Sequence, residues 1–222
     1  MRYCDDHGAD ERLNNDHRLA LIRFREPVAA ETDPRQCAIP LPELGGTATA
    51  EVWISPSPVQ VGRVSGVSYA GNGEALFLQL QSDEYAPDAL QPVTAIAYRR
   101  LFAVARAQGY PHLLRIWNYL PDINEEYGGL ERYRAFCAGR RQVLDATLGE
   151  VETRLPAASA IGFPKSFAQV GEGMGEGLRL YALAGRDAGE QIENPRQISA
   201  FHYPPEYGPR SPSFSRAVLK HW

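Results

Sequence analysis

A single strong helical pattern among strand-like segments constrains this chain most. Residues 93–108 are rich in alanine, leucine and arginine, and Thr94, Leu101 and Val104 recur at helical spacing. This spacing places them on one face of a helix. Gly109 follows the pattern, and glycine commonly ends a helix. The sequence therefore predicts a helix over 93–108 that buries one face.

Strand-like segments lie on both sides of this helix. They are short, apolar or alternating, and several are rich in Val, Ile, Trp or Tyr, as strands usually are. The Asn72-Gly73 pair indicates a turn, so residues 59–80 are expected to form a hairpin. With a second helix expected over 130–147, the order is strands, helix, strand, helix. The other expected strands are 19–24, 50–54, 112–120, 155–163 and 178–184, with a turn and then a strand over 194–203.

Composition and charge exclude several classes of protein. Of the 222 residues, 44% are hydrophobic and 23% charged, which is typical of a globular chain with a sizeable core. The net charge of -4 argues against nucleic acid as the main partner, while local basic clusters can still hold a small anion. No apolar run approaches the ~20 residues of a membrane helix. Residues 1–18 are polar and acidic, unlike a signal peptide, and are expected to fray. We expect a cytoplasmic protein with no nucleic-acid or membrane partner.

Cysteines, histidines and glycines do not indicate a metal or nucleotide site. The three cysteines, Cys4, Cys37 and Cys137, lack CxxC spacing and are interpreted as free thiols. The five histidines are scattered, with none three or four residues apart, so no metal site is expected. The glycine-rich stretch 171–177 contains two glutamates that would repel phosphate. We interpret this stretch as a mobile hairpin loop.

Arginines and tyrosines are the more informative polar residues. Arg115 lies inside the otherwise apolar strand 112–120, where a solvated arginine and an arginine carried to a cavity are both compatible with the pattern. A further set follows along the chain. Guanidinium forks and phenol hydroxyls suit a small dicarboxylate, although both residue types are also common near proline-rich turns. This set comprises Arg140, Arg196, Arg210, Arg216, Tyr181, Tyr203 and Tyr207.

Several stretches resemble one known family. HLLRIWNYLPDIN (112–124) and GGLERYRAFCAGR (128–140) are similar to the N-terminal signature of chorismatases, which include chorismate hydrolases and 3-hydroxybenzoate synthases. RLPAASAIG, LRLYALAG and ENPRQISAFHYPPEYGPRSPSFSRA resemble the next blocks of that family, in the same order. The resemblance runs from about Glu51 to Ala217 and rests on unusual strings such as RIWNY and YGPRSPSF.

The resemblance implies an α+β fold. A chorismatase N-terminal domain would be followed by a partial RidA (YjgF)-like domain, with helices on one face of a mixed sheet. The composition shifts near 148–158, which is the candidate boundary. We therefore expect a lead-in and first strand over 1–48, a chorismatase N-terminal-type domain over 49–150, and the first part of a RidA-like domain over 151–222.

The resemblance also implies chorismate as substrate and pyruvate as one product, with no metal or organic cofactor. The enol ether of chorismate must be protonated on its methylene carbon before the C–O bond opens. That step needs a general acid with a raised pKa, together with fixed cations for the two carboxylates. Leu178 and Ser215 lie near positions that help to choose between hydrolysis and aromatisation. The residues that match substrate-binding positions of the family are Arg140, Tyr181, Tyr203 and Arg216.

The sequence departs from the family pattern at its end. Chorismatases continue past the SFSRA block to a helix whose glutamates serve as the acid, whereas this chain ends six residues after Arg216. Glu190, Glu193 and Glu206 are the nearest carboxylates, and the catalytic residue stays unassigned. We expect an uncovered sheet face and edge, and hence poor solubility, self-association or a complementing chain. A non-catalytic small-carboxylate binding module and a fragment of a split enzyme are the alternatives to an active enzyme.

Overall fold

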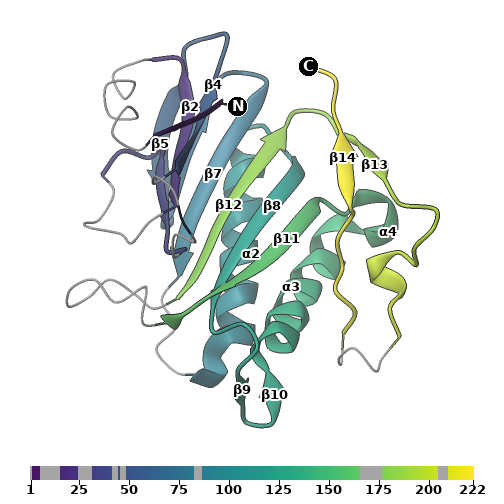
Figure 1. The fold of residues 1–222 in the computed structure, drawn as a ribbon. Helices are drawn as coiled ribbons and strands as arrows, with labels where there is room; N and C mark the ends of the chain where they lie inside the picture. The colour runs from purple at the N-terminus through teal and green to yellow at the C-terminus, as the bar shows by residue number, and fades with distance from the viewer. Residues whose placement is uncertain are drawn as a thin grey trace.

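A six-stranded mixed sheet forms the centre of the molecule (Figure 1). The computed structural model describes residues 2–5, 16–24, 32–41, 45, 49–82, 87–165, 177–204 and 210–222. The strand order is β11-β8-β12-β7-β6-β5, and only the β11–β8 pair is parallel. Its strands are β5 (Gln60–Val64), β6 (Val67–Gly71), β7 (Ala75–Ser82), β8 (His112–Pro121), β11 (Ala157–Phe163) and β12 (Leu178–Gly185).

Helices cover one face of this sheet. Helix α2 (Leu90–Ala107) follows a short 3-10 turn, η1 (Pro87–Ala89), and packs beside α3 (Arg132–Leu148). Figure 1 shows both helices behind the sheet. Apolar side chains of the helices and the sheet form one buried core there, with Leu101 and Phe136 fully enclosed. Burial of this apolar surface is the main force that fixes the helices on the sheet.

A second, four-stranded sheet packs against part of the opposite face, which we call the front face. Its order is β1-β4-β2-β3, with β2 and β3 parallel and the other pairs antiparallel. Its strands bury residues such as Ile22 and Trp53 against Phe77 of β7. The strands of this sheet are β1 (Arg2–Asp5), β2 (Arg18–Phe24), β3 (Gln36–Ile39) and β4 (Thr49–Ile54).

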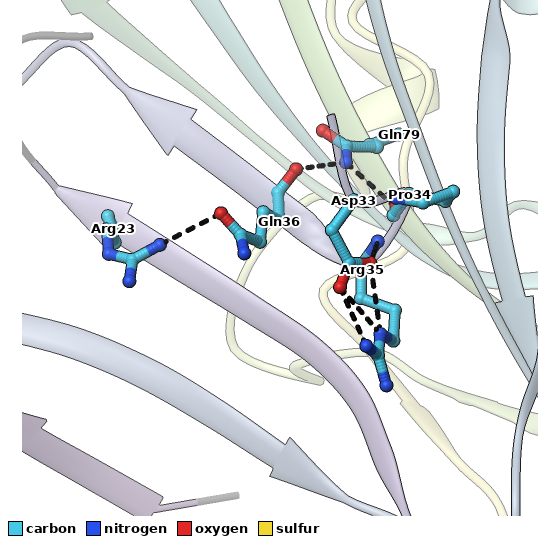
Figure 2. A network of polar contacts seen from close by, with 6 residues as sticks. All are labelled: Arg23, Asp33, Pro34, Arg35, Gln36 and Gln79. Atoms are coloured by element: carbon cyan, nitrogen blue, oxygen red, sulfur yellow. Dashed lines mark hydrogen bonds and ion pairs between the residues drawn. The ribbon is translucent and has the colours of Figure 1, made fainter. Parts of the chain in front are cut away.

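Polar contacts tie the second sheet to β7 (Figure 2). The Gln79 amide donates to the Pro34 carbonyl at 2.9 Å and also to the Gln36 carbonyl. Just before β3, the Asp33 and Arg35 side chains form an ion pair at 2.7 Å. Because these contacts satisfy backbone groups at the entry to β3, they fix where the second sheet meets the front face.

Short elements complete the described part of the chain. The β9 (Glu126–Tyr127) and β10 (Leu130–Glu131) hairpin precedes α3, and α4 (Val151–Arg154) follows it. A 3-10 turn, η3 (Ala200–His202), lies in the segment between the two strands of a short ribbon. That ribbon pairs β13 (Glu190–Ile192) with β14 (Ala217–Leu219). Among the described residues, neither long helix is apolar enough to span a bilayer.

The structure corrects three local predictions. Residues 2–5 do not fray but pair with β4 as β1, while 6–15 lie outside the described residues. The segment 59–80 is a three-stranded meander, because Ser65 and Gly66 adopt φ of 51° and 78° and add a second turn. The segment 194–203 contains η3 where a strand was expected.

The other expected elements are confirmed to within a few residues, including the helix over 93–108, observed over 90–107. Strands from both sides of the candidate boundary near 148–158 share the large sheet. The division into domains therefore stays a prediction, and the confirmed fold class is a mixed arrangement of helices and sheets. Most of the loop 171–177 lies outside the described residues.

Candidate functional site

An aromatic stack lies on the front face, where β8 and β12 run side by side. Tyr181 and Trp117 are direct partners in the antiparallel register, so their side chains point to the same side. Their ring centroids are 4.7 Å apart with 20° between the planes. Tyr119 stacks on Tyr181 from the same strand as Trp117, at 5.8 Å and 23°. Trp53 of β4 closes the stack from the second sheet, 5.4 Å from Trp117.

The two tyrosines of this stack remain protonated at physiological pH. Their hydroxyl oxygens are 3.2 Å apart and share a hydrogen bond. Burial raises the pKa of Tyr119 to about 12, although the hydrogen bond with Tyr181 lowers it. Burial, followed by the neighbouring Tyr119 hydroxyl, raises the pKa of Tyr181 further above its ordinary value. The pair can therefore donate a hydrogen bond to an anion but cannot act as a base near neutral pH.

Arg115 extends this cluster along β8. Its guanidinium carbon lies 4.8 Å from the centre of the Trp117 ring. Its Nε is buried and, within the described part of the chain, has no hydrogen-bond partner. The same holds for the Oγ of Ser159 on β11. In the parallel register, Ser159 is the partner of Trp117, while Ala157 is the partner of Arg115, so the two unpaired groups occupy diagonal positions on one face.

This arrangement is suited to an unsaturated carboxylate. A buried donor without an acceptor is costly, so the Arg115 Nε is stabilised when an oxygen anion approaches it. Neutral hydroxyls at Tyr181 and Ser159 add donors beside the stacked rings of Trp117 and Tyr181. We name Arg115, Trp117, Tyr119, Tyr181 and Ser159 the front-face cluster.

Arg140, predicted to bind substrate with Tyr181, lies on the other side of the sheet. It belongs to α3, is 4% exposed and donates a hydrogen bond to the Ser213 carbonyl. Its guanidinium also lies 5.8 Å from the Phe136 ring in the core between helices and sheet. The structure therefore does not bring Arg140 and Tyr181 together, and Arg140 fastens the segment that leads to β14.

Arg216 and Tyr203 do lie together, away from the stack. The Arg216 Nη2 donates to the Ile198 carbonyl at 3.1 Å and to the Tyr203 hydroxyl at 3.4 Å. The Glu193 carboxylate accepts a hydrogen bond from the Arg216 backbone N–H at 3.1 Å, and its Oε2 is 3.8 Å from the Arg216 Nε. These contacts join Arg216 to three other positions of the segment between β13 and β14.

Leu178 and Ser215, predicted to influence the product, are also separate. Leu178 is fully buried against the helices at the start of β12. Ser215 forms an isolated bridge to Ala157 of β11. Across the sheet, Ala157 is level with Arg115 of β8, and Arg115 is level with Leu183 of β12. Leu183 is five residues along β12 from Leu178, so the two positions are about 16 Å apart along the strand direction. Their roles stay predictions.

No residue in the described part of the chain is assigned as the general acid. Of the nearest carboxylates, Glu190 is exposed, Glu193 contacts Arg216, and Glu206 lies outside the described residues. Among the described residues, no Asp, Glu or His is fully buried. In the same ranges, no group of three or more His, Cys, Asp or Glu could hold a metal ion.

Of the front-face cluster, only Tyr181 was predicted from the sequence to bind substrate, although one further pattern was present. Arg115, Trp117 and Tyr119 recur at a spacing of two within RIWNY, which places them on one face of a strand. What the spacing cannot show is that β12 inserts next to β8 and adds Tyr181, which lies 62 residues after Tyr119 in the sequence.

Comparisons with known proteins show the family of this chain. A family model described as "Chorismatase FkbO/Hyg5-like, N-terminal" matches residues 51–172. A 3-hydroxybenzoate synthase from Streptomyces hygroscopicus is 37% identical over 172 residues, which cover 76% of this chain and 46% of that protein. A chorismatase from the same organism is 39% identical over 173 residues, or 77% of this chain and 46% of that protein.

A solved chorismatase crystal structure superposes with a TM-score of 0.80 and 34% identity, and covers 98% of this chain and 63% of that one. The chain therefore belongs to the FkbO/Hyg5-like chorismatase family. It spans about half the length of the curated relatives that it matches.

Proposed function

We propose that this protein acts on chorismate and releases pyruvate, leaving either a hydroxybenzoate or a dihydroxycyclohexadiene carboxylate. The observation that carries the proposal is the likeness, over most of the chain, to proteins named chorismatase and 3-hydroxybenzoate synthase. Chorismate has two carboxylates and an unsaturated ring. The front-face cluster offers a guanidinium nitrogen that has no acceptor among the described residues, together with neutral hydroxyls beside aromatic rings, and these groups suit both features.

Arg115 is the residue that we propose for one carboxylate of the substrate. Its Nε is buried without an acceptor in the described residues, and stacking on Trp117 holds the guanidinium in place. An arginine fixed in this way loses little side-chain entropy when it binds a carboxylate. Tyr181 is the one residue of the sequence-predicted set that lies in this cluster, and we propose that its neutral hydroxyl, paired with that of Tyr119, orients the ligand.

Arg140, Arg216 and Tyr203 have a different proposed part. Their contacts hold the segment between β13 and β14 to α3 and to itself. We infer that they position this segment. The general acid that protonates the methylene carbon of the enol ether is not assigned.

We further infer that the large sheet as a whole is a RidA-like layer, which differs from the expected RidA-like part over 151–222, because only β11 and β12 of this sheet lie in that range. Its mixed strand directions and the two helices on one face support this assignment. In this assignment, the front face is the side of the sheet that binds the ligand and that packs against the second sheet.

Pyruvate release tests the proposal directly. The purified chain is given chorismate, and pyruvate is followed with lactate dehydrogenase, beside an Arg115→Gln variant. Loss of a charge-assisted contact should lower kcat/KM by about 10²-fold. Arg99→Gln is the matched control, because Arg99 is exposed on α2 and remote from the cluster. Equal rates for Arg115→Gln and wild type would contradict the proposal that Arg115 binds a carboxylate of the substrate.

If no pyruvate appears, binding of chorismate is measured by calorimetry on the same samples. Binding that Arg115→Gln weakens, without turnover, would identify a carboxylate-binding module and contradict the enzymatic proposal. Absence of both turnover and binding would also contradict the proposal that the front-face cluster binds chorismate.

A further inference from the structure

A cavity lies on the helix side of the molecule, away from the front-face cluster. Its volume is about 220 Å³, and none of the cluster residues lines it. It is enclosed by the C-terminal ends of α2 and α3, by α4, by the start of β8 and by the β13–β14 ribbon. This volume is below the range of about 300–1,000 Å³ that is typical for drug-sized ligands, so the cavity suits a smaller molecule.

The floor of this cavity is apolar and fixed. Phe102, Leu113, Leu114 and Leu155 line it, and each is at most 7% exposed. Because these side chains also belong to the core or pack against it, they cannot rearrange freely. A ligand with a small apolar body would remove further apolar surface from water here, which favours binding.

The rim of the cavity is cationic. Arg106, in the last turn of α2, and Arg154, at the end of α4, both line it, as does His112. Within the described ranges, neither guanidinium has a hydrogen bond or an ion pair, and no Asp or Glu is among the lining residues. Two uncompensated arginines at one opening attract anions, even though the whole chain has a net charge of -4.

We propose that this cavity is a second binding site, which takes a small monocarboxylate with a single-ring apolar body. The carboxylate would pair with Arg106 and Arg154 at the rim, while the ring would enter the apolar floor. Inorganic phosphate supplies charge without an apolar body, and a neutral alcohol supplies the body without charge. Neither satisfies both parts of the cavity, and the proposal is independent of the reaction at the front face.

The test is an NMR titration of the full chain with three probes: benzoate, inorganic phosphate and benzyl alcohol. Benzoate should bind about tenfold or more tightly than either other probe, because only benzoate uses both the arginines and the floor. Its largest shifts should fall on amides at the cavity, such as those of Thr147, Gly189 and Gln191. Shifts at Trp117 and Tyr181 without shifts at the cavity amides, or equal binding of phosphate and benzoate, would overturn the proposal.

Charge-matched variants locate the site. The double variant Arg106→Gln/Arg154→Gln should weaken benzoate binding by about tenfold or more. The double variant Arg99→Gln/Arg100→Gln removes the same charge from exposed positions of α2 outside the cavity and should bind as wild type does. Arg115→Gln should likewise leave this binding unchanged. Equal weakening in both double variants would show a general charge effect and overturn the proposal. Thermal unfolding of each variant confirms that it is folded.

Discussion

The hydroxyl oxygens of Tyr119 and Tyr181 lie 3.2 Å apart, on adjacent strands, with their rings stacked. Both groups are buried, and burial raises the pKa of Tyr119 to about 12 and that of Tyr181 further still. Unfolded tyrosines ionise near 10. Below that pH the folded and unfolded states are both protonated here, whereas above it the unfolded state loses protons that the folded state retains.

Stability should therefore fall as the pH rises above about 10. Each such tyrosine contributes a slope of about 1.4 kcal/mol per pH unit until its folded pKa is reached. Guanidinium chloride unfolding from pH 8 to above pH 11 measures this slope. Tyr119→Phe should make it shallower and should cost about 1 kcal/mol near neutral pH through the lost hydrogen bond. Tyr127→Phe, at a position 36% exposed, is the control, and an equal change in slope there would contradict the prediction.

Arg216→Ala should destabilise the fold. The side chain joins Glu193, the Ile198 carbonyl and Tyr203, so its removal should lower the free energy of unfolding by about 1–2 kcal/mol. Arg196→Ala, at an exposed position in the same segment, should change it by less than about 0.5 kcal/mol. Denaturant unfolding measures both. If the two variants are equally stable, Arg216 is not a structural link and its family-derived role in substrate binding becomes the better explanation.

Gly139→Ala should be destabilising although alanine is the better helix former. A methyl group at this position of α3 would lie 2.2 Å from the Gln91 carbonyl oxygen and 3.0 Å from the Thr94 Cβ, both on α2. Separating the helices should cost about 1–3 kcal/mol, which exceeds the gain of about 1 kcal/mol in helix propensity. Ala146→Gly, at an exposed position of α3, measures the propensity effect alone. A more stable Gly139→Ala variant would show that the helices do not cross here.

The Asp33–Arg35 pair should make stability sensitive to acid (Figure 2). Burial alone would raise the pKa of Asp33, but hydrogen bonds from the Arg35 side chain and backbone hold it below its usual range. The contribution is therefore present above about pH 4 and is lost as the pH falls through the folded value. Asp33→Asn should cost about 0.5–1 kcal/mol at neutral pH, and its unfolding curve should merge with that of wild type in strong acid. Asp187→Asn, 84% exposed beside Lys220, should have no measurable effect at either pH.

Local patterns predicted most elements of this fold but not how they assemble. The helix over 90–107 follows from the spacing of Leu101 and Val104, because one helix face must meet the core. The Ser65-Gly66 turn was missed, although a Ser-Gly pair is a turn signal, because residues 59–69 were interpreted as one alternating strand. The β13–β14 ribbon was missed because three-residue strands carry too little pattern to be recognised.

The candidate site was predicted only in part for a similar reason. Tyr181 was identified from its block, and Arg115 was noted, but no sequence pattern indicates that they lie on one face of the same sheet. That neighbourhood depends on strand order, which is set by long-range packing. Arg140 was identified from its residue type and its family block, and only the structure shows that it lies behind the sheet with Phe136.

The position of β12 has a consequence for the order in which the chain can fold during synthesis. Strands β7 and β8 are not neighbours, because β12 lies between them and pairs with both. A nascent chain that has released β8 must therefore keep two central strand edges unpaired until residues 178–185 leave the ribosome. Any fragment that ends before Leu178, including one matched to residues 51–172, would lack the strand that joins the two halves of its sheet.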